Sequence, residues 1–106
     1  MAFLTQLGYT IVERNWRAGA TGEIDIVAMD GSTQVFVEVK TSTSGRFGPP
    51  EGWVTPNKCR RLTTLAQKFI AGYDGQYTMV RFDVMAVQWQ HGRWLATHLK
   101  DAFDAI

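Results

Sequence analysis

Two segments of alternating apolar and polar residues, 23–29 and 34–40, flank a turn that contains Asp30-Gly31. Alternation on both sides of an Asp-Gly turn predicts a β-hairpin. The side chains of a strand alternate between its two faces. The pattern therefore divides the first segment between two faces of the strand. One face carries Ile24, Ile26 and Ala28, and the other carries Glu23, Asp25, Val27 and Met29. The second segment divides into Val35, Val37 and Val39 against Phe36, Glu38 and Lys40.

The hairpin has two candidate registers. A loop at Gly31-Ser32 places Asp25 opposite Glu38, whereas a loop at Asp30-Gly31 places Glu23 there instead. Either register gathers three carboxylates and one lysine in a small, otherwise apolar patch. Like charges on neighbouring strands repel, and a divalent cation such as Mg²⁺, which prefers oxygen ligands, would offset that repulsion. The alternative is an ordinary solvated face.

The rest of the chain predicts a mixed α/β order around this hairpin. We expect a helical fragment at 2–7 ended by Gly8, a strand at 9–17, a loop at 18–22, a helix at 55–71, a strand at 76–89, an edge strand at 93–99 and a helical turn at 101–106. The crossover from Lys40 to Tyr77 would make the strands that it joins parallel.

The helix at 55–71 has clear start and stop signals. Thr55 is a favoured N-cap, Pro56 suits the first helical position, and Gly72 suits the end. Its apolar stripe consists of Cys59, Leu62, Leu65, Ala66, Phe69 and Ile70. At about 100° per residue, Lys58 lies inside this stripe, so we expect it to meet the hairpin carboxylates or a phosphate. Arg60 and Arg61 are expected on the solvated flanks.

The strand at 76–89 is apolar on both faces, which is typical of the middle of a sheet covered on both sides. Arg81 and Asp83 share its less apolar face, and we expect a structural role for both. His91 lies in a turn and His98 near the end of the next strand, without metal-ligand spacing, so neither is assigned a role.

The connection at 41–54 is long for a compact domain, and such loops are often functional. Arg46, Phe47 and Trp53 could contact phosphate and stack on bases. Alternatively, Phe47 and Trp53 only anchor the loop to the core.

Composition narrows the class of protein. The 106 residues predict one domain, and 45% hydrophobic with 20% charged residues is ordinary for a globular protein. No segment approaches the ~18 apolar residues of a membrane span, and no signal peptide opens the chain. A single cysteine excludes an internal disulfide, so we expect a cytoplasmic protein. The net charge of +1 neither supports nor excludes a nucleic-acid partner.

An aspartate on one strand followed by Glu-x-Lys on the next resembles the active-site hairpin of the restriction-endonuclease-like nucleases, known as PD-(D/E)XK. Asp25 and Glu38-Val39-Lys40 fit this pattern, although Ile24 stands where a proline often precedes the aspartate. More narrowly, the chain is similar to the YraN-type bacterial family, whose core resembles archaeal Holliday-junction resolvases. The matching phrases are Gly8-Tyr9, Arg14-Asn15-Trp16-Arg17, Gly22-Glu23-Ile24-Asp25, Val35-Phe36-Val37-Glu38-Val39-Lys40-Thr41, Phe47-Gly48, Lys58 with Arg61-Leu62, and Arg81-Phe82-Asp83-Val84.

This resemblance implies one α/β domain over residues 1–106, with an αβββαβ core and a central mixed sheet flanked by helices. It implies a nuclease that hydrolyses DNA phosphodiester bonds with Mg²⁺ or Mn²⁺, and branched or damaged DNA are candidate substrates. Asp25, Glu38 and the Val39 carbonyl would hold the metal, and Lys40 would act on the attacking water. The supporting residues would be Glu23, Thr41 and Lys58, and the contacts to nucleic acid would come from Arg46, Phe47 and Lys58.

Two alternatives remain open at this stage. Members of the family usually begin with a longer helix that carries a further glutamate, whereas this sequence starts after that position, and Glu23 would be its substitute. The domain could therefore bind nucleic acid or a protein partner without cutting. Alternatively, the hairpin acids form only structural ion pairs. A homodimer is compatible with either function.

Overall fold

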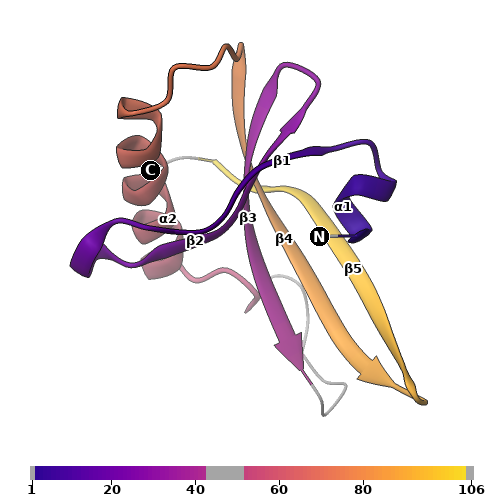
Figure 1. Ribbon diagram of the computed structural model, residues 1–106. Helices are drawn as coiled ribbons and strands as arrows, with labels where there is room; N and C mark the ends of the chain where they lie inside the picture. Colours follow the sequence, from indigo (N-terminus) through magenta and orange to yellow (C-terminus); the bar gives the residue numbers. More distant parts are fainter. Residues whose placement is uncertain (1, 43–51, 105–106) are drawn as a thin grey trace.

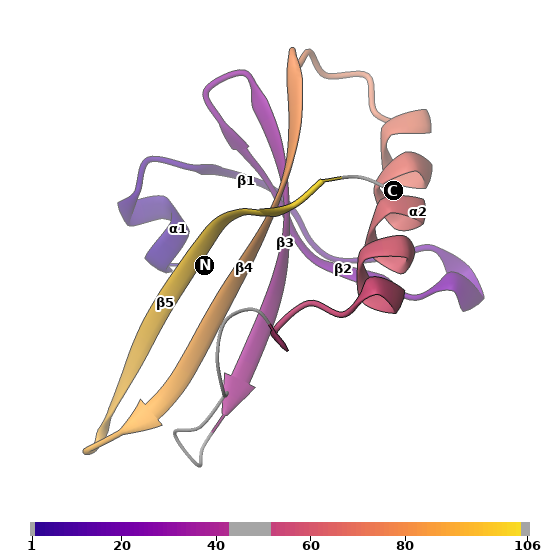
Figure 2. The ribbon, with the colours of Figure 1, turned by 180° about the vertical axis from the view of Figure 1, so that it is seen from behind.

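A five-stranded mixed β-sheet forms the centre of the computed structural model, which describes residues 2–42 and 52–104. The strands follow one another across the sheet in sequence order, and a helix lies on each side of it (Figure 1 and Figure 2). The elements are α1 (Ala2–Gln6), β1 (Thr10–Arg17), the 3₁₀ turn η1 (Gly19–Thr21), β2 (Glu23–Asp30), β3 (Thr33–Ser42), α2 (Pro56–Ala71), β4 (Met79–Gln90) and β5 (Arg93–Phe103). The α/β class is confirmed, and the architecture is consistent with a restriction-endonuclease-like core.

The pairing of the strands follows from their connections. β1, β2 and β3 are antiparallel neighbours, β3 and β4 are parallel, and β5 returns antiparallel to β4. The helical crossover through α2 explains the parallel pair, as the sequence predicted. β4, apolar on both faces, lies between β3 and β5 with both faces covered by buried side chains.

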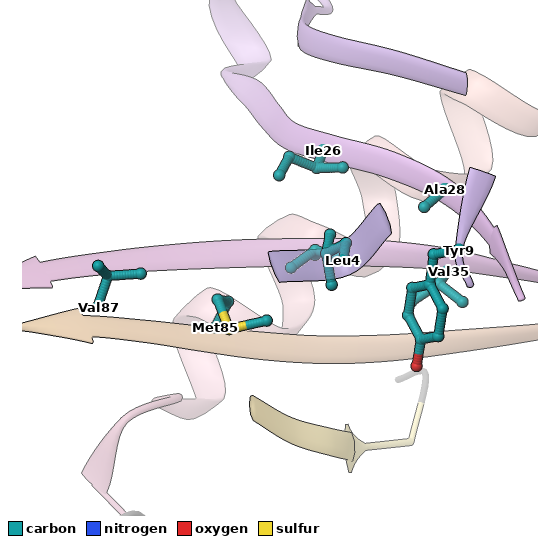
Figure 3. Close-up of a cluster of buried hydrophobic side chains, with 8 residues drawn as sticks. Leu4, Tyr9, Ile26, Ala28, Val35, Met85 and Val87 are labelled. Carbon is teal, nitrogen blue, oxygen red and sulfur yellow. The ribbon is translucent and has the colours of Figure 1, made fainter. Parts of the chain in front are cut away.

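Two hydrophobic clusters hold the helices against the sheet. On the side of α1, Leu4 projects among side chains of β2, β3 and β4 and is fully buried (Figure 3). On the other side, Leu62, Leu65 and Phe69 of α2 pack on Val27 and Phe36. Burying such side chains contributes about 1.5–3 kcal/mol each relative to exposure, so the two clusters fix both helices.

The predicted boundaries of α2 are confirmed. The Thr55 hydroxyl accepts a hydrogen bond from the Lys58 backbone N–H at 3.2 Å, Pro56 opens the helix and Gly72 ends it. Before it, Trp53 is buried against Val84 and Ala86. Trp53 therefore anchors the connection to the core. Arg46 and Phe47 lie outside the described residues.

β5 is longer than the sequence predicted. It continues to Phe103, so the helical turn expected from Asp101 is wrong for the residues that the structure describes. Asp101 has a φ of 55°, and the pairing between β4 and β5 shifts register between Phe82 and Val84. This bulge keeps the strand in the sheet and frees the Asp101 N–H for another partner.

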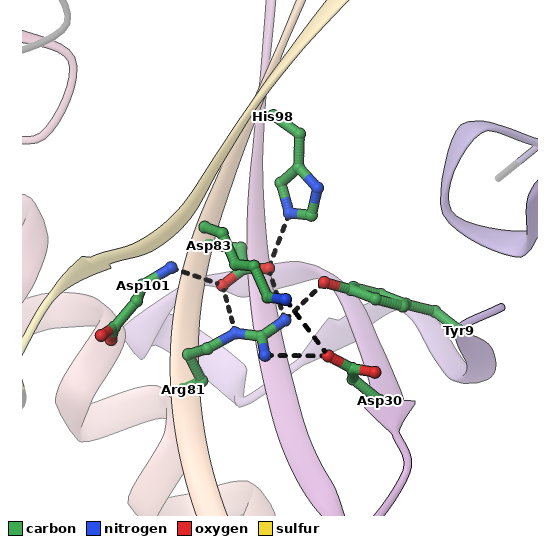
Figure 4. Close-up of polar contacts among 7 residues, drawn as sticks. Tyr9, Asp30, Arg81, Asp83, His98 and Asp101 are labelled. Atoms are coloured by element: carbon green, nitrogen blue, oxygen red, sulfur yellow. Dashed lines mark hydrogen bonds and ion pairs between the residues drawn. The ribbon is translucent and has the colours of Figure 1, made fainter. Parts of the chain in front are cut away.

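That partner is Asp83, which is 1% exposed and lies at the centre of a polar network (Figure 4). Its carboxylate accepts two hydrogen bonds from the Arg81 guanidinium at 2.8 and 3.0 Å, one from the Asp101 N–H at 3.0 Å, and contacts His98 Nε2 at 2.7 Å. Arg81 also bonds Asp30 at 2.9 Å and the Tyr9 hydroxyl. Arg81 and Asp83 pair with each other, in agreement with the structural role expected for both, and His98 joins them.

The network keeps Asp83 ionised inside the sheet. Burial alone would raise the pKa of the Asp83 carboxyl, but the hydrogen bonds from Arg81, Asp101 and His98 outweigh burial and lower that pKa. The hydrogen bond to Asp83 in turn raises the pKa of Arg81. A buried charge with complete hydrogen bonding is tolerated, whereas removal of one partner leaves the other charge unpaired.

Asp83→Asn should therefore lower the unfolding free energy at neutral pH by about 3 kcal/mol or more, because Arg81 loses its buried counter-charge. The pKa of Asp83 is lower in the folded protein than in the unfolded chain. Its contribution to the unfolding free energy is therefore fully present above the ordinary pKa of aspartate and is lost as the pH falls through the pKa of Asp83 in the folded protein. Denaturant titration at several pH values measures it. Asp101→Asn makes the same chemical change on an exposed side chain and keeps the N–H donor, so equal effects of the two variants would contradict the account.

Candidate functional site

The hairpin adopts the first of the two candidate registers. Met29 pairs with Gln34 and Asp30 with Thr33, which leaves Gly31 and Ser32 as the loop. Gly31 has a φ of 60°, a conformation that glycine adopts without strain. At the other end, regular pairing stops at Ile26 and Val37, one residue before Asp25 and Glu38 would meet.

The Asp25 carboxylate bridges the strands where the ladder stops. Its Oδ2 accepts a hydrogen bond from the Val39 backbone N–H at 2.8 Å. This bond occupies an amide that a continued ladder would have paired, and it ties Asp25 to β3 directly beside Glu38. The Asp25 side chain is thus held in place by the backbone of the Glu-x-Lys segment.

A switch of faces in β1 and β2 explains how Asp25 reaches this position. Asn15 has a φ of 51°, a left-handed conformation that asparagine tolerates better than most residues. On one side of this point, Ile26 packs in the hydrophobic cluster around Leu4 of α1, which we call the α1 cluster. On the other side, Trp16 and Ile24 pack in the cluster around Leu62, Leu65 and Phe69 of α2, which we call the α2 cluster. The expectation that Ile24 shares a face with Ile26 is therefore wrong, because strict alternation assumes an unkinked strand.

The kink also shapes the sheet around the site. Beyond it the paired ends of β1 and β2 curve away from the other strands and run alongside α2 (Figure 1 and Figure 2). Trp16 meets Phe69 of α2 edge-on, with ring centroids 5.3 Å apart. The start of β2 is thereby brought beside α2, where Leu65 and Arg61 approach Gly22.

Asp25 and Glu38 are half-buried carboxylates that influence each other. Burial raises the pKa of both. For Asp25, the hydrogen bond from Val39 lowers the pKa and the charge of Glu23 raises it; for Glu38, the charge of Asp25 raises it further. The fold therefore disfavours the ionised form of both acids, and a nearby cation would offset this by favouring the ionised form.

Three cations surround these acids. Lys58 and Arg61 of α2 lower the pKa of both carboxyls, and Lys40 lowers that of Glu38. Among the described residues, however, none of the three forms an ion pair within 4.0 Å of either carboxylate. The charges face one another without direct pairing, unlike those of the Asp83 network.

Arg61 is exposed on a flank of α2, as the sequence predicted. Its Cδ nevertheless lies 3.9 Å from the position that a β-carbon on Gly22 would take, next to Leu65. The charge of Arg61 lowers the pKa of both carboxyls, an effect that the sequence prediction did not include. The helical periodicity contained the signal, because Arg61 lies only about 40° around the helix from Leu65.

The supporting residues divide into two groups. Glu23 forms an ion pair with Arg17 at 3.4 Å, and its charge also acts on Asp25. Thr41 lines a cavity of about 380 Å³ next to Asp25. We call this space the Asp25 cavity; its lining residues are Arg14, Asn15, Asp25, Ile26, Val39 and Thr41.

The donor atoms at this site fit a hard divalent cation that keeps much of its water. Mg²⁺ typically takes one or two carboxylates and retains several water ligands, and Asp25 and Glu38 provide two. Within residues 2–42 and 52–104, no group of three or more His, Cys, Asp or Glu side chains is arranged to hold a metal. A protein cage such as a zinc or calcium site would need is therefore not present in this part of the chain.

The fold and the site together define an α/β protein in which two strand carboxylates and several cations meet at the end of a central hairpin. The family model described as "Uncharacterised protein family UPF0102" matches residues 1–87. The chain belongs to this family, which confirms the YraN-type resemblance. None of the described helices is long and apolar enough to span a membrane.

Individual relatives agree with this assignment. A UPF0102 protein of Geotalea daltonii is 46% identical over 105 residues, which are 98% of this chain and 82% of the relative. One from Anaeromyxobacter dehalogenans is 42% identical over 97% of this chain and 76% of its own length. One from Streptomyces coelicolor is 49% identical over 79% of this chain and 65% of its own length. The similarity thus includes both strands of the central hairpin.

Glu38→Gln should stabilise the metal-free protein at neutral pH, because it removes a half-buried charge that Asp25 repels. The pKa of the Glu38 carboxyl is higher in the folded protein than in the unfolded chain. The contribution of this carboxyl to the unfolding free energy is therefore fully present below its ordinary pKa and is lost as the pH rises through its pKa in the folded protein. We expect a gain of roughly 0.5–1 kcal/mol, the scale of a cross-strand charge pair. The gain should vanish near about pH 4, where carboxyls are protonated.

Thermal melts in a metal-chelating buffer over this pH range provide the measurement. Glu13→Gln is the matched control, because Glu13 is exposed on β1. A Glu38→Gln protein that is less stable than the wild type at neutral pH would show that the carboxylate is satisfied in the fold.

Proposed function

We propose that this protein is a metal-dependent nuclease of the restriction-endonuclease-like superfamily that hydrolyses DNA phosphodiester bonds. The observation that carries the proposal is the pair of half-buried carboxylates, Asp25 and Glu38. Asp25 is anchored by the Val39 N–H, and the cations that act on the pair form no ion pair with either acid in the described part of the chain. A structural cluster would pair its charges, as Asp83 and Arg81 do. This cluster leaves space between acids and bases, which suits a metal and a phosphate.

Each residue then has a distinct task. Asp25 and Glu38 would hold Mg²⁺ or Mn²⁺, together with the Val39 carbonyl. When bound, the metal supplies charge neutralisation at the phosphate and a lower pKa for a water molecule. Lys40, whose charge acts on Glu38, would orient the attacking water and stabilise negative charge as it develops on the phosphoryl oxygens.

The cations of α2 would bind the substrate. Lys58 and Arg61 act electrostatically on both carboxylates from the first turns of the helix. Such side chains contact the phosphate backbone and carry no sequence information. Binding should therefore weaken steeply with salt and vary little with DNA sequence. Arg46 and Phe47 are further candidates for this surface.

A second function, binding of nucleic acid without cleavage, is favoured by one specific observation. The described residues contain no third acid close enough to complete a group with Asp25 and Glu38. A binding module would use the same cations, and the carboxylates would then only weaken its affinity.

Lys40→Ala separates the two functions. In a nuclease, Lys40 acts mainly in the transition state, so its loss should slow cleavage about a hundredfold or more while DNA affinity changes little. In a binding module, Lys40 is one phosphate contact among several, and its loss should weaken affinity and lower the salt slope by about one unit. Cleavage and binding should be measured on branched, flapped, linear and single-stranded DNA with Mg²⁺ and with Mn²⁺.

Two kinds of control accompany this variant. Lys100→Ala removes one lysine charge at the far end of the hairpin, where Lys100 lies 3.8 Å from Asp30 and is 60% exposed, and should leave both readouts unchanged. Asp25→Asn should abolish cleavage and tighten metal-free DNA binding, because it removes a repelling charge. If the wild-type chain leaves every substrate intact with either metal, the nuclease proposal is wrong.

A further inference from the structure

The phrase Arg14-Asn15-Trp16-Arg17 stands out in the sequence, and the proposed function leaves its first two residues without a task. Both residues line the Asp25 cavity. The cavity's remaining polar side chains are Asp25 and Thr41. Its volume of about 380 Å³ is within the range of sites for small molecules or groups.

The backbone of Asn15 puts Arg14 there. Arg14 pairs with Ile26 and Trp16 with Ile24 in an unbroken register, although their side chains point to different faces. The left-handed conformation of Asn15, between the two pairs, makes this change of face. Without it, strict alternation would place Trp16 on the same face as Arg14. The kink therefore directs Trp16 into the α2 cluster and leaves Arg14 beside the cavity.

The charges around the cavity indicate the kind of ligand. Arg14 is exposed and forms no ion pair with the part of the chain that the structure describes. A guanidinium matches the geometry of phosphate oxygens and binds them in a bidentate manner. The Thr41 hydroxyl is a further donor at the rim. The one acid, Asp25, would be neutralised by the metal that the proposed function assigns to it.

We propose that the Asp25 cavity binds a phosphodiester group adjacent to the one that is cut, with Arg14 as its principal donor and Thr41 as a second. This inference rests on the proposed function and extends it with a substrate contact. The DNA strand would cross the point where β2 and β3 part, between Lys58 and Arg61 on one side and Arg14 on the other. Asn15 is a positioning residue that acts through Arg14.

Binding of fluorescently labelled single-stranded and duplex DNA, measured by anisotropy in metal-free buffer at several salt concentrations, tests this inference. Arg14→Ala should weaken binding about tenfold and lower the salt slope by about one unit. Arg14→Lys should keep the slope but recover only part of the affinity, because an ammonium group cannot form the bidentate contact. Lys100→Ala, which removes a charge far from the cavity, should bind like the wild type.

Two substitutions at Asn15 test the positioning role. Asn15→Gly can adopt the left-handed conformation and should bind like the wild type. In Asn15→Val, the β-branched side chain disfavours positive φ, so this variant should lose as much DNA affinity as Arg14→Ala. Adding Arg14→Ala to Asn15→Val should cause no further loss of affinity. Thermal melts establish that each variant is folded, and Arg14 is exposed, so its truncation leaves the core intact.

The outcomes separate this inference from the proposed function. If the wild type binds no DNA in this buffer, the phosphate site fails, whereas the proposed function fails only if the wild type also leaves DNA intact with Mg²⁺ and with Mn²⁺. If the wild type binds DNA and Arg14→Ala binds equally well at every salt concentration, the cavity is not a phosphate site, although the proposed function stands. Equal affinities of Asn15→Val and the wild type would likewise overturn the positioning role.

Discussion

The hydrogen bond from the Val39 N–H to the Asp25 carboxylate is the interaction on which the site depends. It replaces a backbone pair at the point where β2 leaves β3. The bond therefore does two things at once: it satisfies an amide of a central strand, and it fixes an acid beside Glu38. A carboxylate held by the backbone keeps its orientation when the charge around it changes, which is what a binding or catalytic group requires.

The molecule contains two acidic centres with opposite electrostatics. Asp83 is matched by Arg81, His98 and the Asp101 N–H, and its pKa is lowered. Asp25 and Glu38 are unmatched, and their pKa values are raised. The first arrangement stabilises the fold, whereas the second destabilises it until a cation arrives. Perturbed carboxyls in a partly buried cluster are typical of functional sites, and within this sheet Asp25 and Glu38 are therefore the candidates for such a site.

Much of this architecture could be predicted from local sequence signals. The hairpin, the capped helix after Thr55 and the doubly apolar strand around Val84 each follow from a short pattern and its period. The resemblance in Asp25 and Glu38-Val39-Lys40 predicted the candidate site, because those residues are near one another in a single hairpin. Turn chemistry left only two registers for the hairpin.

Other features depend on contacts between distant segments or on a single backbone angle. The face switch at Asn15 could not be deduced from a two-residue period, since asparagine is also common in ordinary turns and loops. His98 pairs with Met85 in the regular part of the β4–β5 register, which brings it within contact of Asp83 two residues along β4. The pairing of β4 with β5 determines that contact, and no spacing of histidines in the sequence predicts it.

The proposed function requires that Asp25 and Glu38 together hold a divalent cation. A crystal grown with Mn²⁺ would reveal such an ion through anomalous scattering recorded near the manganese absorption edge. We expect one strong anomalous peak between the two carboxylates, beside the Val39 carbonyl, and its loss in crystals of Asp25→Asn. No peak at these carboxylates, or manganese bound only at other acids such as Asp30, would contradict it.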